Sequence, residues 1–311
     1  MEKAIGGYFG LENLIHKEYY SGLIALNTAR NAVVYLIKTK KIKKLFVPTY
    51  LCDSITKVCE REGCAYEFYD VCEDFQPNFD KKLRDDEWLY IVNYYGQVTN
   101  EAELKKIYQR IILDNVQAFF QRPIVGIDTL YSCRKFFGVP DGAYLSSDIR
   151  LDVEQDVSKD RMIHILGRYE KSASDYYIDY VENEETYYNL PLRGMSLLTH
   201  NILGAIDYEN VKRIREENFH FLYDRLSSTN GINVKKVEGP FAYPYYVKNG
   251  MKIKRMLAEK DIYIASLWPN AFEFEGLPRD YSENILPLPC DQRYTIEDME
   301  ALVKELEAVI H

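Results

Sequence analysis

The chain has 311 residues, of which 47% are hydrophobic and 28% charged, values typical of a soluble globular protein large enough for two domains. Its net charge of −9 argues against a general nucleic-acid binder, which would carry a basic surface. The sequence contains neither an apolar stretch of membrane-spanning length nor a signal-peptide pattern, so we expect a cytoplasmic protein. Its six cysteines follow no C-x-x-C spacing, so we expect free thiols and no metal site.

Residues 44 to 147 predict a mainly parallel sheet. Short apolar segments rich in β-branched and aromatic residues recur there, and helical patterns separate several of them. The predicted strands are 44–50, 66–71, 87–94, 110–114, 124–132 and 142–146, and the predicted helices include 53–62 and 100–109. Such alternation predicts a sheet covered by helices on both faces, with ligands bound beyond the carboxyl ends of its strands.

The second half of the chain predicts a helical region followed by a smaller α/β unit. The pattern from about 150 to 225 is helical and polar, and a loop at 189–194 interrupts it. The elements predicted next are two strands and the helix between them, at 241–247, 262–266 and 252–259. A last helix is predicted to start at a Thr295 cap. We therefore predict a large domain over 1–205 and a small α/β domain over 206–311.

An acid, an amide, a hydroxyl and a lysine lie at or near the ends of consecutive predicted strands. They are Asp114, Gln117, Ser132 and Lys135. Pyridoxal phosphate (PLP) requires such groups, because a lysine forms a Schiff base with its aldehyde and an acid pairs with its pyridinium nitrogen. Lys135 lies among aromatic residues and beside Arg134, and both surroundings favour the neutral amine. Taken alone, Lys135 is more often an ordinary surface lysine and Asp114 a helix cap, so the order and spacing of the whole set carry the prediction.

Thr28, Ala29 and Arg30 form a second candidate group, at the start of an amphipathic helical pattern. A hydroxyl, a small residue and free backbone amides at a helix N-terminus make an anion site, and Arg30 adds a charge suited to phosphate. The alternative is simple helix capping by Asn27 or Thr28.

With these residues in place, the chain resembles the DegT/DnrJ/EryC1/StrS family of sugar aminotransferases, which are fold-type-I PLP-dependent enzymes. The resemblance runs from about residue 20 to the C-terminus. The family's phosphate-binding Ser-Gly-Thr turn is similar to Thr28-Ala29-Arg30. Its Asp-x-Ala-Gln/His motif is similar to Asp114-Asn-Val-Gln117, which implies that Asp114 contacts the ring nitrogen and Gln117 lies near the phenolic oxygen.

Further segments resemble the motifs that surround the family's reactive lysine. The Ser-Phe-x-x-x-Lys segment is similar to the shorter Ser132-Cys-Arg-Lys135, which implies a phosphate contact for Ser132 and the Schiff base for Lys135. Residues 140–143 stand where the family has a Gly-Glu-Gly-Gly turn. The His-x-Tyr-Gly segment resembles Asn93-Tyr-Tyr95-Gly, which implies that Asn93 lies at the cofactor and Tyr95 near the substrate.

The chain departs from the family at two functional positions. The count that gives the family's ring-stacking aromatic falls on Cys52, so Tyr50, the nearest aromatic residue, is the predicted stacking residue. The loop that reaches the neighbouring subunit's cofactor is matched only by Arg193-Gly-Met-Ser, without its asparagine. Arg193 is therefore the residue expected to contact the substrate or a partner subunit.

The resemblance implies a homodimeric PLP-dependent aminotransferase with small-molecule substrates. Glutamate is the expected amino donor, and a keto-sugar attached to a nucleotide is the expected acceptor, as in bacterial polysaccharide or deoxysugar biosynthesis. Two alternatives stay open. One is a PLP enzyme of the same fold with a different reaction or a non-nucleotide substrate, and the other is a non-catalytic binding protein that has kept the fold.

Overall fold

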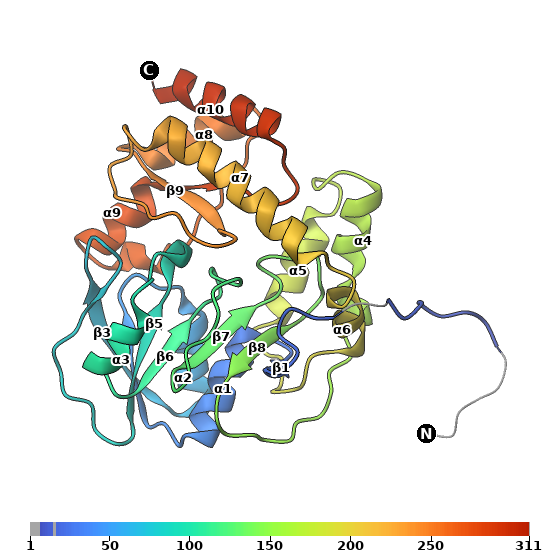
Figure 1. Cartoon of the computed structure of the whole chain (residues 1–311), viewed down its shortest axis with the longest axis vertical. Coiled ribbons are helices and arrows are strands. Elements are labelled where there is room, and N and C mark those ends of the chain that lie inside the picture. The colour runs from blue at the N-terminus through green and yellow to red at the C-terminus, as the bar shows by residue number, and fades with distance from the viewer. Residues whose placement is uncertain (1–6, 15–16, 311) are drawn as a thin grey trace.

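An eight-stranded sheet lies at the centre of the larger part of the molecule (Figure 1). The computed structural model describes residues 7–14 and 17–310. The strand order is β1-β8-β7-β6-β5-β2-β3-β4. The strands are β1 (Ile24–Leu26), β2 (Lys44–Pro48), β3 (Ala65–Val71), β4 (Pro77–Asn78), β5 (Glu87–Val92), β6 (Ile111–Asp114), β7 (Asp128–Ser132) and β8 (Ala143–Ser146). The central pairs from β3 to β7 are parallel, and β1, β4 and β8 pair antiparallel. The predicted mainly parallel α/β fold is confirmed.

Alternate side chains of each central strand enter different cores, as the period of two in a strand requires. Leu45 and Val47 of β2 pack with helices α1 (Ala29–Thr39) and α2 (Asp53–Glu62) on one face. Phe46 enters the core on the opposite face, which includes Leu104 of α3 (Glu101–Ile107). Both faces of the sheet are therefore covered, and the strand ends are the places open to ligands.

The C-terminal part of the chain has a core of its own. Strands β9 (Ala242–Tyr246) and β10 (Ile285–Pro289) pair antiparallel and pack with helices α7 (Tyr208–Leu226), α8 (Gly250–Ala258) and α10 (Ile296–Ile310). Thr295 and Asp298 form the capping box of α10, because the backbone amide of each residue donates to the side chain of the other, at 2.8 and 3.3 Å. Short helix α9 (Leu277–Asn284) precedes β10.

Three helices lie in the sequence between the last strand of the large sheet, β8, and helix α7: α4 (Ile163–Glu170), α5 (Tyr177–Thr186) and α6 (Leu197–Leu203). Single turns of 3-10 helix complete the structure at η1 (Tyr94–Gly96), η2 (Lys159–Arg161) and η3 (Pro269–Glu273). The predicted domain boundary at residue 205 falls between α6 and α7 and stays a prediction. In the part of the chain that the structure describes, no helix combines the length and hydrophobicity of a membrane span.

One predicted strand is wrong. Residues 262–266 form no strand, and the carbonyl of Ala265 accepts a hydrogen bond from Lys254 Nζ at 3.0 Å. The partner of β9 is β10, whose prolines count against a strand in sequence because they cannot donate to a ladder. The register places Pro287 opposite Pro244. A sheet of only two strands tolerates both residues because each strand has an edge that needs no hydrogen bonds.

Candidate functional site

The ends of β6 and β7 bring the predicted acid and hydroxyl to one edge of the sheet. β6 ends at Asp114 and its parallel neighbour β7 ends at Ser132, so both residues lie at carboxyl ends. Lys135 follows in the turn before β8, where the amide of Cys133 donates to the carbonyl of Gly142 at 3.0 Å. The fold thus brings Asp114, Ser132 and Lys135 together.

Asp114 is a buried carboxyl group that accepts hydrogen bonds but forms no ion pair with any residue in 7–14 or 17–310. Tyr90 Oη donates to Oδ2 at 2.6 Å, and the amide of Val116 donates to Oδ1 at 2.9 Å. Burial raises the pKa of Asp114 to about 6, in spite of these hydrogen bonds. Among the described residues, only the more distant Lys135 contributes a favourable positive charge. The site therefore suits a ligand that presents a cationic N–H to this carboxyl group.

Lys135 lines a cavity of about 780 Å³ that also contacts Ser132, His164 and Arg168. Its side chain is exposed in this cavity, yet the surrounding protein removes much of its water. This desolvation is the main cause that lowers the pKa of Lys135, and the adjacent positive charge of Arg134 adds to it. The prediction of a lysine biased toward its neutral, nucleophilic form is consistent with this environment.

The N-terminus of α1 lies beside this edge and carries a cation without a complete set of partners. Thr28 caps the helix, since its Oγ1 accepts from the amide of Asn31 at 3.0 Å. The guanidinium carbon of Arg30 lies 4.4 Å from the centre of the Tyr188 ring. Its Nε is buried and has no hydrogen-bond partner among the described residues. A cation beside the free backbone amides of a helix N-terminus suits an anion.

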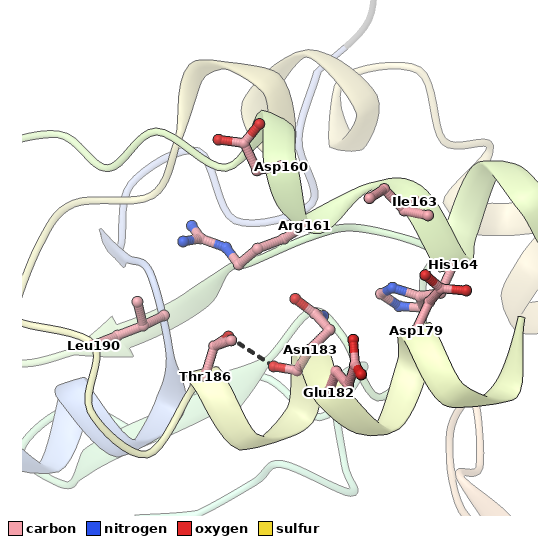
Figure 2. A pocket seen from close by; sticks show the side chains of 9 residues that line it. All are labelled: Asp160, Arg161, Ile163, His164, Asp179, Glu182, Asn183, Thr186 and Leu190. Carbon is pink, nitrogen blue, oxygen red and sulfur yellow. Dashed lines mark hydrogen bonds between the residues drawn. The ribbon is translucent and has the colours of Figure 1, made fainter.

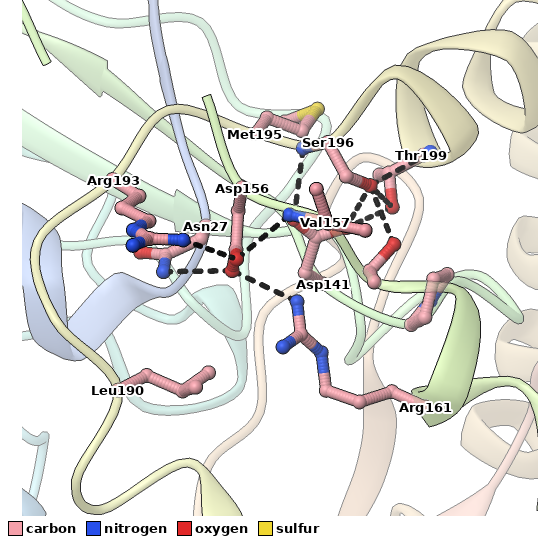
Figure 3. A network of polar contacts seen from close by, with 12 residues as sticks. Asn27, Asp141, Asp156, Val157, Arg161, Leu190, Arg193, Met195, Ser196 and Thr199 are labelled. Atoms are coloured by element: carbon pink, nitrogen blue, oxygen red, sulfur yellow. Dashed lines mark hydrogen bonds and ion pairs between the residues drawn. The ribbon is translucent and has the colours of Figure 1, made fainter. Parts of the chain in front are cut away.

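Asn27 connects this helix end to the turn that carries Lys135. Its carbonyl accepts a hydrogen bond from the amide of Gly142 at 2.7 Å, and its own amide donates to the carbonyl of Arg193 at 2.9 Å. Its side-chain Nδ2 donates to Asp156 Oδ2 at 3.0 Å, and Asp156 in turn accepts from Arg161 at 2.8 Å (Figure 3). Three distant parts of the sequence therefore meet at one buried residue.

Asp141 anchors the same turn from the other side. Its carboxylate is fully buried and accepts hydrogen bonds from the amide of Ser196 at 2.9 Å, from Ser196 Oγ at 2.7 Å and from Thr199 Oγ1 (Figure 3). The next residue, Gly142, has a φ of +115°, and a Cβ there would lie 3.0 Å from Thr199. The turn after Lys135 is thus fixed to α6 by a charged group and by close packing.

Two further predicted residues, Asn93 and Gln117, form hydrogen bonds to the segment that follows β5. Asn93 Nδ2 donates to Asn115 and Gln121 at 2.9 and 2.6 Å, and its Oδ1 accepts from the amide of Val98 at 2.8 Å. Gln117 Oε1 accepts from the amide of Tyr95 at 2.9 Å. This bond supports the left-handed backbone of Tyr95, whose φ is 54°. Contacts of these residues with a cofactor or substrate stay predictions.

Tyr50 is buried in an aromatic cluster next to the site. Its ring stacks on Tyr94 with a centroid distance of 5.0 Å and lies 4.5 Å from the ring of Trp268, which comes from the C-terminal part of the chain. Cys52 is half-buried, with its Sγ 2.8 Å from Ser54 Oγ. Stacking of Tyr50 on a cofactor ring stays a prediction.

Arg193 lies near acidic residues of its own chain. Its guanidinium nitrogens are 3.8 Å from Glu154 and 3.9 Å from Asp156. The contact with a substrate or partner subunit therefore stays a prediction.

Sequence reasoning missed the aromatic residues that hold the site's charged groups. Tyr188 lies under Arg30, and the ring of Tyr187 is 3.5 Å from the guanidinium carbon of Arg134, which also pairs with Glu184. No local pattern marks these tyrosines. Tyr90 could have been predicted from the sequence, because the alternation of side chains along β5 and β6 places it on the same face of the sheet as Asp114.

A second cavity, of about 310 Å³, lies between α4 and α5 and includes none of the predicted site residues (Figure 2). Asp160, Asp179 and Glu182 give it an acidic lining, with His164 shared with the Lys135 cavity. The described residues contain no cluster of side chains suited to a metal ion, and the six cysteines are free thiols.

Solved structures share this architecture over nearly the whole chain. The sugar aminotransferase CalS13 from Micromonospora echinospora superposes with a TM-score of 0.65 at 14% identity, covering 92% of this chain and 87% of its own. A DegT DnrJ EryC1 StrS aminotransferase from Brucella abortus gives 0.61 at 15% identity, with coverages of 93% and 87%. The chain has the fold of these aminotransferases. Spr1654 from Streptococcus pneumoniae, proposed to be a sugar aminotransferase and solved in its PLP form, gives 0.64 at 13% identity, with coverages of 92% and 86%.

By sequence, no family model and no curated protein matches the chain. The likeness therefore lies in the fold, and the chemistry must be argued from this chain's own residues.

The anchoring role of Asp141 leads to a stability prediction. Asp141→Ala should lower the free energy of unfolding by about 3 kcal/mol or more, because it leaves buried donors of Ser196 and Thr199 without an acceptor. Urea unfolding at 25 °C measures the change. The matched control is Asp160→Ala, at an exposed side chain, which should change stability by less than about 0.5 kcal/mol. Equal effects of the two substitutions would contradict the anchoring role.

Proposed function

We propose that the chain is a PLP-dependent aminotransferase whose reactive residue is Lys135. The observation that carries the proposal is the convergence of three incomplete groups at one sheet edge. These are an exposed lysine with a lowered pKa, a buried carboxyl group that pairs with no described cation, and a helix N-terminus whose arginine Nε has no hydrogen-bond partner among the same residues. They correspond to the aldehyde, the ring nitrogen and the phosphate of PLP.

The residues present fit the cofactor at each of these positions. When bound, PLP supplies an aldehyde that bonds to amines and a protonated ring that accepts electrons. Lys135 would hold the aldehyde, and Asp114 would keep the ring nitrogen protonated. Thr28, Arg30, Ser132 and the amide of Ala29 would hold the phosphate.

Lys135 and Asp114 would then divide the acid–base work. When not bonded to the cofactor, Lys135 Nζ would move a proton to and from the substrate carbon. The lowered pKa supports this role, because the neutral amine can accept the proton. Tyr90 would orient the Asp114 carboxyl group through its hydrogen bond of 2.6 Å.

The substrates proposed are glutamate as amino donor and a nucleotide-linked keto-sugar as acceptor. The structural neighbours include the sugar aminotransferase CalS13, which supports a sugar substrate. The cavity also contains Arg168, whose guanidinium suits carboxylate or diphosphate groups, whereas Arg293 is paired with Asp291 at 2.7 Å. A cytoplasmic location and a homodimer that shares residues between its sites complete the proposal.

Reductive labelling tests the position of the cofactor. After incubation with PLP and reduction by borohydride, peptide mapping should locate the label on Lys135. Lys254 provides a matched control, because burial also lowers its pKa, to about 8, and it lies on α8, in the C-terminal part of the chain. Lys135→Ala should abolish the label and Lys254→Ala should leave it. A label that persists in Lys135→Ala rejects the assignment.

The proposed role of Asp114 predicts a loss of rate rather than a loss of binding. Asp114→Asn should retain PLP but slow the half-reaction with an amino donor by on the order of 100-fold or more, because an amide stabilises the protonated ring poorly. Rapid mixing monitored by visible absorbance measures the rate. Tyr90→Phe keeps the carboxyl group and removes one hydrogen bond, so its effect should be smaller. A near-normal rate in Asp114→Asn would mean that Asp114 has only a structural role.

Subunit mixing tests whether Arg193 acts in a partner's site. Arg193→Ala and Lys135→Ala chains should each be nearly inactive, and their mixture should regain activity, since one site of each mixed dimer contains neither change. Mixing Asp114→Asn with Lys135→Ala is the control, because each site of that mixed dimer carries one change. If subunits exchange and the first mixture stays inactive, Arg193 serves its own chain.

A further inference from the structure

Helices α4 and α5 carry an apolar surface that no described residue covers. Large side chains of both helices are exposed, among them Ile163, Leu166, Tyr169, Tyr177 and Ile178. Tyr169 is 92% exposed and Ile178 is 71% exposed. Single exposed apolar residues are ordinary, but several on two adjacent helices mark a surface that another molecule covers. These five residues are called the α4–α5 face below.

A second apolar segment is the N-terminal arm, residues 7–14. It contains no helix or strand, and Tyr8 and Phe9 are 99% and 96% exposed. The C-terminal end of the arm is attached to α6. There the amide of Leu14 donates to Asn201 Oδ1 at 2.8 Å, and Asn201 Nδ2 donates to the carbonyl of Glu12 at 2.9 Å. From there it extends away from the body on the side where α4 and α6 lie (Figure 1).

We propose that the arm of one copy packs on the α4–α5 face of a second copy, and that a twofold dimer contains this contact twice. In such a dimer the same two surfaces meet in both directions, so each chain offers one arm and one face. The arm carries Tyr8, Phe9, Leu11 and Leu14 but only one charged residue, Glu12, which suits an apolar receptor. The inference extends the homodimer proposed above and does not depend on the cofactor.

The area available is sufficient for a stable dimer. Aromatic side chains bury roughly 150–250 Å² each at interfaces. Tyr8, Phe9, Tyr169 and Tyr177 are largely exposed, so covering them alone would bury on the order of 600–800 Å² per chain. Standard interfaces bury about 800 Å² per partner. The remaining apolar residues of the arm and the face add to this area.

The contact would also complete the Lys135 cavity. Leu166 and Tyr169 belong both to the α4–α5 face and to the wall of that cavity. A partner's arm that covers these side chains would narrow the cavity mouth and exclude water from it. The candidate site would then be built from two chains, with the partner contributing apolar residues.

Sedimentation velocity on matched variants of the full chain tests the proposal. The arm variant is Tyr8→Ser with Phe9→Ser, and the face variant is Tyr169→Ser with Ile178→Ser. The control variant, Val125→Ser with Tyr263→Ser, removes side chains that are 90% and 71% exposed elsewhere. Wild type and control should be dimeric, and the arm and face variants should each raise the dimer dissociation constant by more than about 100-fold. Circular dichroism verifies that all variants are folded.

Disulfide trapping identifies the contact itself. In a Cys72→Ser background, which removes the exposed thiol, chains with Phe9→Cys are mixed with chains with Tyr177→Cys. Cross-linking between chains is expected for this pair and not for Phe9→Cys mixed with Tyr263→Cys.

A monomeric wild type, a dimer that the arm and face variants leave intact, or a dimer that gives no selective cross-link would each overturn the proposal. Labelling of Lys135, measured on the same samples, tests the enzymatic function separately. A monomer that is labelled rejects the interface alone, and an unlabelled dimer rejects the function alone.

Discussion

The hydrogen bond from the amide of Gly142 to the carbonyl of Asn27, at 2.7 Å, joins the two segments on which the candidate site depends. Asn27 immediately precedes the helix end at Thr28, and Gly142 closes the turn that carries Lys135. The bond extends the antiparallel pairing of β1 with β8, in which Leu26 lies opposite Ala143, so the helix N-terminus and the turn of the lysine lie side by side. Asp156 and Asp141 hold the same two segments from the side, so buried polar groups fix the spacing between the candidate anion site and Lys135.

Burial of Asp114 makes an unfavourable electrostatic contribution to the stability of the folded state. Asp114 has a pKa of about 6 instead of 3.8, so its ionised form destabilises the folded state. The cost is absent below pH 3.8, grows as the pH rises, and is complete above about 6. Lys135 is also disfavoured in its charged form, and Arg30 has an unsatisfied nitrogen. A ligand with a cationic ring nitrogen, an amine-reactive group and a phosphate would stabilise Asp114, Lys135 and Arg30 together. The same unfavourable contributions would therefore favour this kind of ligand over others.

Much of the fold could be predicted from local patterns, because hydrophobic periodicity reports directly on strands and helices. β2, β6 and β8 and helix α2 lie within or beside their predicted ranges, and Asp114 and Ser132 lie at the expected strand ends. The strand expected at 262–266 failed because the alternation of apolar residues there does not reveal that no partner strand is available.

The connections within the site could not be predicted in the same way. The residues that Asn27 and Arg30 contact, such as Asp156 and Tyr188, lie more than a hundred positions away in sequence. Only the sheet order and the path of the loop after α5 bring them near.

The central claim is that these groups form one cofactor site, and the visible absorption spectrum tests it most directly. The purified protein incubated with PLP and then dialysed should retain an absorption band that glutamate alters, and Lys135→Ala should lose the response to glutamate. A wild-type protein that retains no visible absorbance after dialysis would contradict the account.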